Sequence, residues 1–466
     1  MIVPQNRLLF WFAAIVLPFA LAMAVEPAAA VVSLACVGAL GIVLIGDAIA
    51  GHSHLAGIAM ALPEVVRMSK AREGKIEIRI QNKRQQQRPL RLALALPLEV
   101  PAMQEDLTVE LPAGSEWSRV LWLCTPTQRG NYAVHFAYVE NPSPLGFWAV
   151  RKTLVVHSEI RVYPNLLQDR KSLAALFLNR GAFGLHAQRQ IGKGRDFEKL
   201  REYVPGDGYD EIHWKATARR GRPITKVFQI EKTQEVYVVI DASRLTARTP
   251  GGESVVSRQS SVAKASGSPA TDHGLLTTDS TLERFMTAAL VLGLAAEQQG
   301  DLFGLLTFTN KVEKFVRAKN GKAHYSACRD ALYTLQPKTV SPDFDELCTF
   351  LRLRLRRRSL LFFLTALDDA QIAGSFVRNV DLIRRQHLVL VNMVQPPGVE
   401  PVFANPNVAT LDQLYQHLGG HLQWQKLREL EKVLKRRGVQ FSLLQNERLS
   451  VELVSQYLNV KRRQLL

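Results

Sequence analysis

The sequence predicts an α/β protein. Its C-terminal domain is expected to be a doubly wound, mainly parallel sheet, preceded by a β-sandwich domain and a two-helix transmembrane hairpin. Three observations support this prediction: two charge-free apolar runs open the chain, short strand-like runs follow from residue 73, and strand and helix patterns alternate after residue 280. Such alternation is typical of parallel sheets with helices on both faces. With 466 residues, the chain is long enough for two or three domains.

The composition is basic and moderately apolar. A net charge of +17 favours a partner that is acidic on average, whether anionic lipid, acidic protein or nucleic acid. The four cysteines are scattered and form no C-x-x-C pair. Their spacing argues against a zinc site and is typical of reduced thiols in a cytosolic compartment.

The first 50 residues are predicted to form the transmembrane hairpin. Residues 8–25 and 28–46 contain no charge, and Glu26-Pro27 is the only break between them. At about 1.5 Å per residue, each run spans nearly the hydrocarbon thickness of a bilayer. Cleavage of the first run as a signal peptide, near Ala22–Ala24, is the alternative. The second apolar run that follows at once favours the hairpin.

Basic residues flank the hairpin on one side only. Arg7 precedes the first run, several Lys and Arg side chains follow the second, and the turn between the runs has none. The positive-inside rule therefore predicts that both termini and the soluble domains are cytoplasmic. Residues 51–72 are expected to be a juxtamembrane linker whose basic side chains lie near anionic headgroups, at about 1 kcal/mol each.

Residues 73–163 are predicted to form the β-sandwich. Alternating apolar runs recur at intervals of roughly ten residues, separated by Pro, Gly and Asn. The segment 142–147 is expected to be a turn between two of these strands. A sandwich of this kind is usually a spacer or a docking module.

Residues 164–466 are predicted to form the α/β domain. Buried strands are expected at 235–241, 302–308, 360–364, 387–394 and 439–444, with a return strand at 312–316. Helices are expected at 282–299, 324–335, 343–355 and 411–437. The segment 246–280 is rich in Ser, Thr and Gly, so it is predicted to be a flexible insertion.

A dense motif spans residues 194–243. It contains G-R-D-F-x-x-L-R-E-Y-x-P-G-D followed shortly by I-x-W-K-A-x-A-R, and Trp214 is expected to pack against the neighbouring sheet. The residues that form the pattern are Phe197, Leu200, Arg201, Tyr203, Pro205, Gly206, Asp207, Ile212, Trp214, Ala218 and Arg219.

This motif resembles the signature of the bacterial "domain of unknown function 58" family. The resemblance implies an inner-membrane protein with a von Willebrand factor type A-like fold, often found beside MoxR-type AAA+ ATPases. Two features depart from the family pattern: Asp210 and Glu211 stand where basic residues are usual, and the Asp-x-Ser-x-Ser metal motif ends in Leu245 instead of a second serine.

The candidate site lies where strand 235–241 ends, because open α/β sheets bind ligands at the carboxyl ends of their strands. In type A domains, three loops at this edge supply oxygens to Mg²⁺ or Mn²⁺. The resemblance implies Asp241 and Ser243 from the first loop, Thr339 or Ser341 from the second, and Asp368 or Asp369 from the third. In the alternative interpretation, these carboxylates only cap helices and loop amides.

Two basic clusters are further candidates. Lys215, Arg219, Arg220 and Arg222 could bind phosphate or an acidic surface, or simply face solvent. The run from Arg352 to Arg358, including Arg354 and Arg356, ends a predicted helix, where cations complement the helix dipole by about 0.3–1 kcal/mol each. We expect no nucleic-acid binding, because these clusters are not interleaved with aromatics that could stack on bases.

No catalytic motif stands out in the sequence: there is no P-loop, G-x-S-x-G or H-E-x-x-H. The lone His213 is expected to be a packed or partly exposed side chain rather than a catalytic base. We therefore predict a membrane-anchored, non-enzymatic module that binds, holds or presents partner proteins. The resemblance implies an AAA+ ATPase as its partner. A metal-dependent ligand-binding domain and an enzyme acting on cell-envelope substrates are the alternatives.

Overall fold

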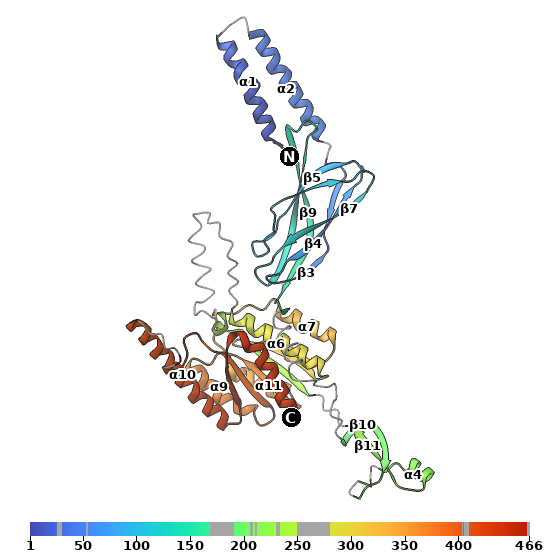
Figure 1. Cartoon of the computed structure of the whole chain (residues 1–466), viewed down its shortest axis with the longest axis vertical. Coiled ribbons are helices and arrows are strands. Elements are labelled where there is room, and N and C mark those ends of the chain that lie inside the picture. The colour runs from blue at the N-terminus through green and yellow to red at the C-terminus, as the bar shows by residue number, and fades with distance from the viewer. Residues whose placement is uncertain are drawn as a thin grey trace. The chain divides into compact units, whose positions relative to one another are not determined.

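The structure of the protein is a computed structural model (Figure 1). It describes residues 1–25, 30–52, 55–167, 191–205, 208–209, 212–229, 234–248, 280–402, 404 and 410–463. The described residues belong to two compact units, one ending at Asn165 and one beginning at Leu166. The predicted mixed α/β class, with a sheet-rich N-terminal part, is confirmed. Most of the predicted flexible insertion at 246–280 lies outside the described residues.

Two apolar helices lie near the start of the first unit. They are α1 (Asn6–Val25) and α2 (Ala30–His52), which pack side by side (Figure 1). By length and composition, α2 is long and apolar enough to cross a membrane, whereas the apolar stretch of α1, Asn6–Ala22, is too short to meet the same criterion. The structure thus contains one candidate membrane span among its described residues, and a second span remains a prediction.

A β-sandwich follows α2. Its larger sheet runs β1-β9-β8-β5-β6 with β3 beside β9, and its smaller sheet runs β2-β4-β7. Apolar side chains from both sheets form one core that includes Ile78, Leu90 and Trp122. The strands are β1 (Ile2–Pro4), β2 (Ile58–Ala61), β3 (Val65–Ser69), β4 (Gly74–Asn82), β5 (Arg88–Leu94), β6 (Leu107–Leu111), β7 (Trp117–Cys124), β8 (Gly130–Pro142) and β9 (Trp148–Tyr163).

The sandwich begins earlier than the sequence analysis placed it. Residues 51–72, predicted to be a linker, contain β2 and β3, and Leu55, Ile58 and Met68 are buried in the sandwich core. Strand β3 pairs with the distant β9 in parallel, a partnership that local sequence patterns do not reveal. Strand β1, which precedes α1, also pairs with β9. Signal-peptide cleavage near Ala22 would therefore remove a strand of the sandwich.

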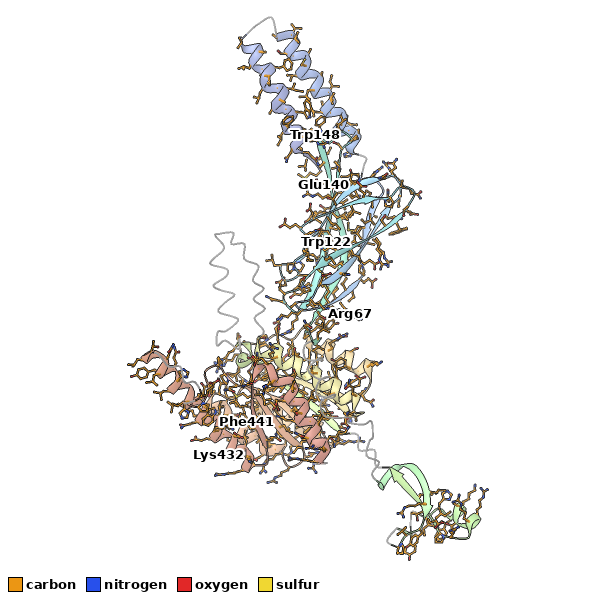
Figure 2. The ribbon with its side chains drawn as sticks, viewed as in Figure 1. Arg67, Trp122, Glu140, Trp148, Lys432 and Phe441 are labelled. Carbon is orange, nitrogen blue, oxygen red and sulfur yellow. The ribbon has the colours of Figure 1, made fainter. Side chains whose placement is uncertain are left out.

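The end of α2 is joined to the turn between β8 and β9. The buried Asp47 carboxylate accepts hydrogen bonds from Ser143 Oγ at 2.5 Å and from the Leu145 amide at 2.9 Å. The indole of Trp148 donates to the Leu44 carbonyl of α2 at 2.9 Å (Figure 2). Gly146 has a φ of +77°, which favours glycine in this turn. The turn at 142–147 is thus also the point where the end of α2 contacts the sandwich.

The second unit contains a six-stranded sheet with the order β14-β13-β12-β15-β16-β17, in which all pairs but β13–β14 are parallel. The strands are β12 (Glu235–Asp241), β13 (Leu302–Phe308), β14 (Val312–Lys319), β15 (Ser359–Leu364), β16 (Leu388–Val394) and β17 (Gln440–Leu444). Most of these bounds agree closely with the predicted ones, because buried parallel strands are continuous apolar runs.

Helices cover both faces of this sheet. Alternate residues of β12 enter two cores: Val238 packs with α6 and α11 on one face, and Val239 packs with α8, α9 and α10 on the other. The helices are α6 (Thr281–Gln298), α7 (Lys322–Leu332), α8 (Phe344–Arg354), α9 (Ala370–Asn379), α10 (Leu411–Arg436) and α11 (Leu449–Arg463), with single 3₁₀ turns at Val380–Leu382 and Asn446–Arg448.

The family-like motif forms a small element of its own. Strands β10 (Ile191–Glu202) and β11 (Ile224–Gln229) make a two-stranded antiparallel sheet, and α4 (Trp214–Arg220) lies in the connection between them. We call residues 191–229 the signature module. Only the last part of the predicted signature, from Glu235, belongs to the six-stranded sheet.

Candidate functional site at the carboxyl edge of the parallel sheet

The centre of the candidate site is the carboxylate of Asp241, the last residue of β12. Its Oδ1 accepts the Ser243 amide at 2.8 Å, and its Oδ2 accepts the Thr365 hydroxyl at 2.7 Å from the end of the neighbouring β15. The residue is 0% exposed. Burial raises the pKa of Asp241, and the hydrogen bonds from Thr365 and Ser243 oppose that rise. The carboxylate therefore ties two parallel strands together beneath the surface.

The first loop continues from Asp241 into a 3₁₀ turn, η3 (Arg244–Ala247). The Ser243 hydroxyl caps this turn by accepting the Leu245 amide at 3.4 Å. Leu245, in the position of the missing serine, is buried. The next long helix, α6, is capped by Ser280 rather than by Asp241. Asp241 thus accepts a loop amide, as in the alternative interpretation, and also bonds the end of the neighbouring strand, which neither interpretation described.

The second loop contacts the first through its backbone. The Lys338 amide donates to the Ala242 carbonyl at 2.8 Å, and the Arg244 amide donates to the Val340 carbonyl at 3.0 Å. The side chains of Thr339 and Ser341 are exposed. The predicted second loop therefore lies beside the first loop. The hydrogen bonds described between the two loops are made by backbone groups, not by the side chains of Thr339 or Ser341.

The third loop follows β15 and contains two aspartates with different roles. Asp369 caps α9 by accepting the Gln371 amide at 2.8 Å. Asp368 pairs through Oδ2 with Nη1 of Arg248 at 2.5 Å. This ion pair joins the end of the first loop to the third across 120 positions of sequence. A side-chain guanidinium thus lies on the carboxylate that the resemblance assigns to a metal.

The residues of these loops do not fit a divalent cation of the type A kind. Mg²⁺ requires several hard oxygens in octahedral geometry. Here Leu245 lacks an oxygen, both oxygens of Asp241 already accept hydrogen bonds, and Asp368 Oδ2 is paired with Arg248. Asp368 Oδ1 is buried without a hydrogen-bond partner among the described residues, yet one such oxygen is not a ligand set.

The motif residues of the signature module differ in how deeply they are buried. Ile212 is buried and bridges to β11 at Thr225, and His213 caps α4 by accepting the Ala216 amide at Nδ1, 3.0 Å away. Trp214, predicted to pack against a sheet, is 68% exposed as the first residue of α4. The prediction for Trp214 was wrong because a helix start turned its side chain outward.

Other motif positions are described only in part. Leu200, Pro205, Ala218 and Arg219 are exposed, while Arg201 and Tyr203 are half-buried. Gly206 and Asp207 lie outside the described residues, as does the side chain of Phe197.

The basic candidates are surface side chains. Lys215, Arg220 and Arg222 are exposed on the signature module, where Arg222 pairs with Glu202 at 2.8 Å. Arg354 ends α8 and lies over the Phe350 ring, 5.7 Å from its centroid. The Arg356 carbonyl accepts Gln386 Nε2 at 2.8 Å. The run at the end of α8 thus takes part in local packing, as its helix-terminal position predicts.

Two residues of the carboxyl edge were missed from the sequence. Thr365 directly follows a predicted buried strand, so the rule that placed Asp241 at the edge could have found it. Arg248 lies inside the predicted insertion, and nothing local indicates its pairing with Asp368.

Comparison with known proteins identifies one family. Residues 199–265 and 257–400 match the family model described as "Protein of unknown function DUF58". The conserved hypothetical protein BatB from Bacteroides thetaiotaomicron is similar in structure, with 13% identity and a TM-score of 0.29, covering 49% of this chain and 99% of that one. An aerotolerance-related membrane protein from Bacteroides fragilis has 12% identity and a TM-score of 0.29, covering 48% and 98%. No curated protein sequence matches the chain.

Proposed function

The chain belongs to the DUF58 family through its C-terminal region, and on that premise we propose a membrane-associated, non-enzymatic module that binds and presents partner proteins. The partner that the family resemblance supports is a MoxR-type AAA+ ATPase. In this proposal both apolar helices cross the bacterial inner membrane, and the β-sandwich and the second unit face the cytoplasm.

Exposure of Trp214 is the observation that carries the proposal. A tryptophan that starts a helix and stays 68% exposed leaves a large apolar surface in water. Tyr209 and Val204 of the same module are also exposed. Tryptophan and tyrosine are enriched among the residues that contribute most to protein–protein binding. Residues of the family-like motif that face outward therefore support contact with another protein.

The charge around Trp214 supports an acidic partner surface. Lys215, Arg219 and Arg220 continue the same short helix, and the described stretch 212–229 contains no acidic residue. An apolar centre with a cationic rim is a common interface arrangement, in which the rim speeds association and the centre supplies affinity.

The test compares two exposed tryptophans in the full-length protein in detergent. Trp214→Ala is the test variant, and Trp117→Ala, on the sandwich strand β7 and 53% exposed, is the matched control. Binding to a MoxR-type ATPase from the same genome is measured by biolayer interferometry. We expect Trp214→Ala to weaken binding by about 30-fold, which corresponds to roughly 2 kcal/mol for an interface hot spot. Trp117→Ala should bind like the wild type.

Equal binding by both variants would remove the signature module from the interface. Reproducible hydrolase activity in the purified protein, abolished by Asp241→Ala, would contradict the non-enzymatic proposal and favour the enzyme alternative. A third outcome is that Trp214→Ala binds the ATPase normally but binds anionic vesicles more weakly than the wild type does. The signature module would then be a lipid-binding surface instead of a protein-binding one.

A further inference from the structure

We propose that Arg248 is a built-in cation at the carboxyl edge of the parallel sheet, and that this edge binds a carboxylate of an acidic partner segment without a divalent metal. The inference rests on the proposed partner-binding function and assigns it a second contact, separate from Trp214. It concerns the edge formed by η3, Thr365 and Asp368.

The position of Arg248 is fixed from two sides. Its guanidinium pairs with Asp368 at 2.5 Å. Its carbonyl accepts both the amide and the hydroxyl of Thr281, each at 3.0 Å, at the first turn of α6. The residue therefore lies between the start of α6 and the loop after β15, on the side of the sheet where parallel strands end.

The charge at this edge is already compensated without a metal. The side chain of Asp368 is only 10% exposed, and the guanidinium of Arg248 lies beside its carboxylate as a counter-ion. Asp241, deeper in the site, is engaged by Ser243 and Thr365 and is closed to solvent. A divalent ion would have to displace the guanidinium and break these hydrogen bonds, while Leu245 offers it no oxygen.

The guanidinium of Arg248 has more N–H donors than its ion pair with Asp368 uses. Arginine carries five N–H donors in a planar fork, and carboxylates bind such forks in a bidentate manner. The Arg248 side chain is 51% exposed although one of its nitrogens contacts Asp368. An exposed arginine side chain of this kind is accessible to a carboxylate ligand, and the chain's net charge of +17 favours acidic partners in general.

The first experiment measures binding of a fluorescein-labelled hexaglutamate peptide to the full-length protein in detergent by fluorescence anisotropy. Arg248→Ala is compared with Arg151→Ala, because Arg151 is a similarly exposed arginine (54%) paired with Glu140 at 2.5 Å in the sandwich. We expect equal binding in EDTA and in millimolar Mg²⁺, at least tenfold weaker binding by Arg248→Ala, and no change in Arg151→Ala.

The second experiment asks whether the edge becomes a metal site when the guanidinium is removed. Arg248→Ala combined with Leu245→Ser restores an Asp-x-Ser-x-Ser sequence and exposes Asp368. We expect millimolar Mg²⁺ or Mn²⁺ to raise the thermal unfolding midpoint of the double variant by several degrees and to leave the wild type unchanged. Leu245→Ser alone is the control, and it should not respond to metal.

A metal-dependent rise in the midpoint of the wild type, lost in Asp241→Asn, would overturn the inference. So would peptide binding that requires Mg²⁺ or is unaffected by Arg248→Ala. These outcomes are independent of the proposed function, since ATPase binding that depends on Trp214 would survive them. Conversely, Trp214→Ala could leave ATPase binding unchanged while Arg248→Ala still weakens binding of the peptide. That outcome would show that the edge binds acidic ligands independently of the ATPase.

Discussion

The hydroxyl of Thr365 donates to the carboxylate of Asp241 at 2.7 Å, across the adjacent ends of β15 and β12. Both residues are fully buried. This bond joins two loops of the candidate site through the central strands of the sheet, so it couples the stability of the sheet to the geometry of its carboxyl edge.

Replacing Thr365 by valine should destabilise the protein. Valine keeps the shape but leaves Asp241 Oδ2 buried without its donor, at a cost of about 1–3 kcal/mol. Chemical denaturation followed by intrinsic fluorescence measures the loss. Thr307→Val is the control, because Thr307 Oγ1 is also buried at the end of a neighbouring strand but has no hydrogen-bond partner among the described residues. That change should be neutral or stabilising, and an equal loss in both variants would refute the role of the bond.

Asp241 should make stability decrease with rising pH. Burial raises the pKa of Asp241 above its ordinary value of 3.8, so the folded state holds the proton more tightly than the unfolded state. The resulting stability is present below pH 3.8 and is lost as the pH rises through the folded pKa. Asp241→Asn removes this dependence. The thermal unfolding midpoints of the wild type and of Asp241→Asn are measured across a pH series. The midpoint of the variant should rise relative to that of the wild type as the pH increases. A difference that does not change with pH would contradict the raised pKa of Asp241.

His387 should weaken the fold in acid. It lies directly before β16, is buried, and neither ring nitrogen has a hydrogen-bond partner among the described residues. Burial lowers the pKa of His387 below its ordinary value of 6.5. Because the folded state resists protonation, stability is present above pH 6.5 and is lost as the pH falls through the folded pKa. The thermal unfolding midpoint is measured across a pH series. Its fall at acidic pH should be smaller in His387→Leu than in the wild type, and an equal fall in both would show that other groups cause it.

Asp47→Ala should loosen the junction between α2 and the sandwich. The variant loses the acceptor for Ser143 Oγ and for the amides of Leu145 and Phe147, and it leaves the buried Ser143 hydroxyl without its partner at Asp47. Hydrogen–deuterium exchange by mass spectrometry on the detergent-solubilised protein should show faster exchange in the 143–148 segment. Ser33→Ala, another buried polar residue of α2, serves as the comparison and should leave that segment unchanged.

The fold of the second unit was largely predictable because its strands are continuous apolar runs. The strand at 302–308 was predicted to the residue. Helices α9 and α11 were missed, although Leu449, Leu453, Val454 and Tyr457 recur at helical spacing and Asp369 is a good cap. The cap of α9 and the apolar spacing of α11 were both present in the sequence, so both helices could have been predicted from it.

Only those residues of the candidate site that directly follow a strand could be predicted from the sequence. Asp241 and Ser243 were placed at the correct edge by the rule for parallel sheets. The Arg248–Asp368 pair joins residues 120 positions apart, and ion pairs of that kind leave no local pattern. Strand β3 was missed for the same reason, because its partner β9 lies about ninety residues away. The outward direction of Trp214 depended on where α4 begins, which propensity locates only within a few residues.

The two attachments of α1 and α2 to the sandwich have a mechanical consequence. Strand β1 holds the chain before α1, and the Asp47 contacts hold the end of α2. Two separate attachments leave the sandwich less freedom to rotate relative to these helices than a single flexible linker would. Under the proposal that both helices cross a membrane, a tilt of the helices imposed by lipid thickness or by a neighbouring protein would therefore be transmitted to the sandwich.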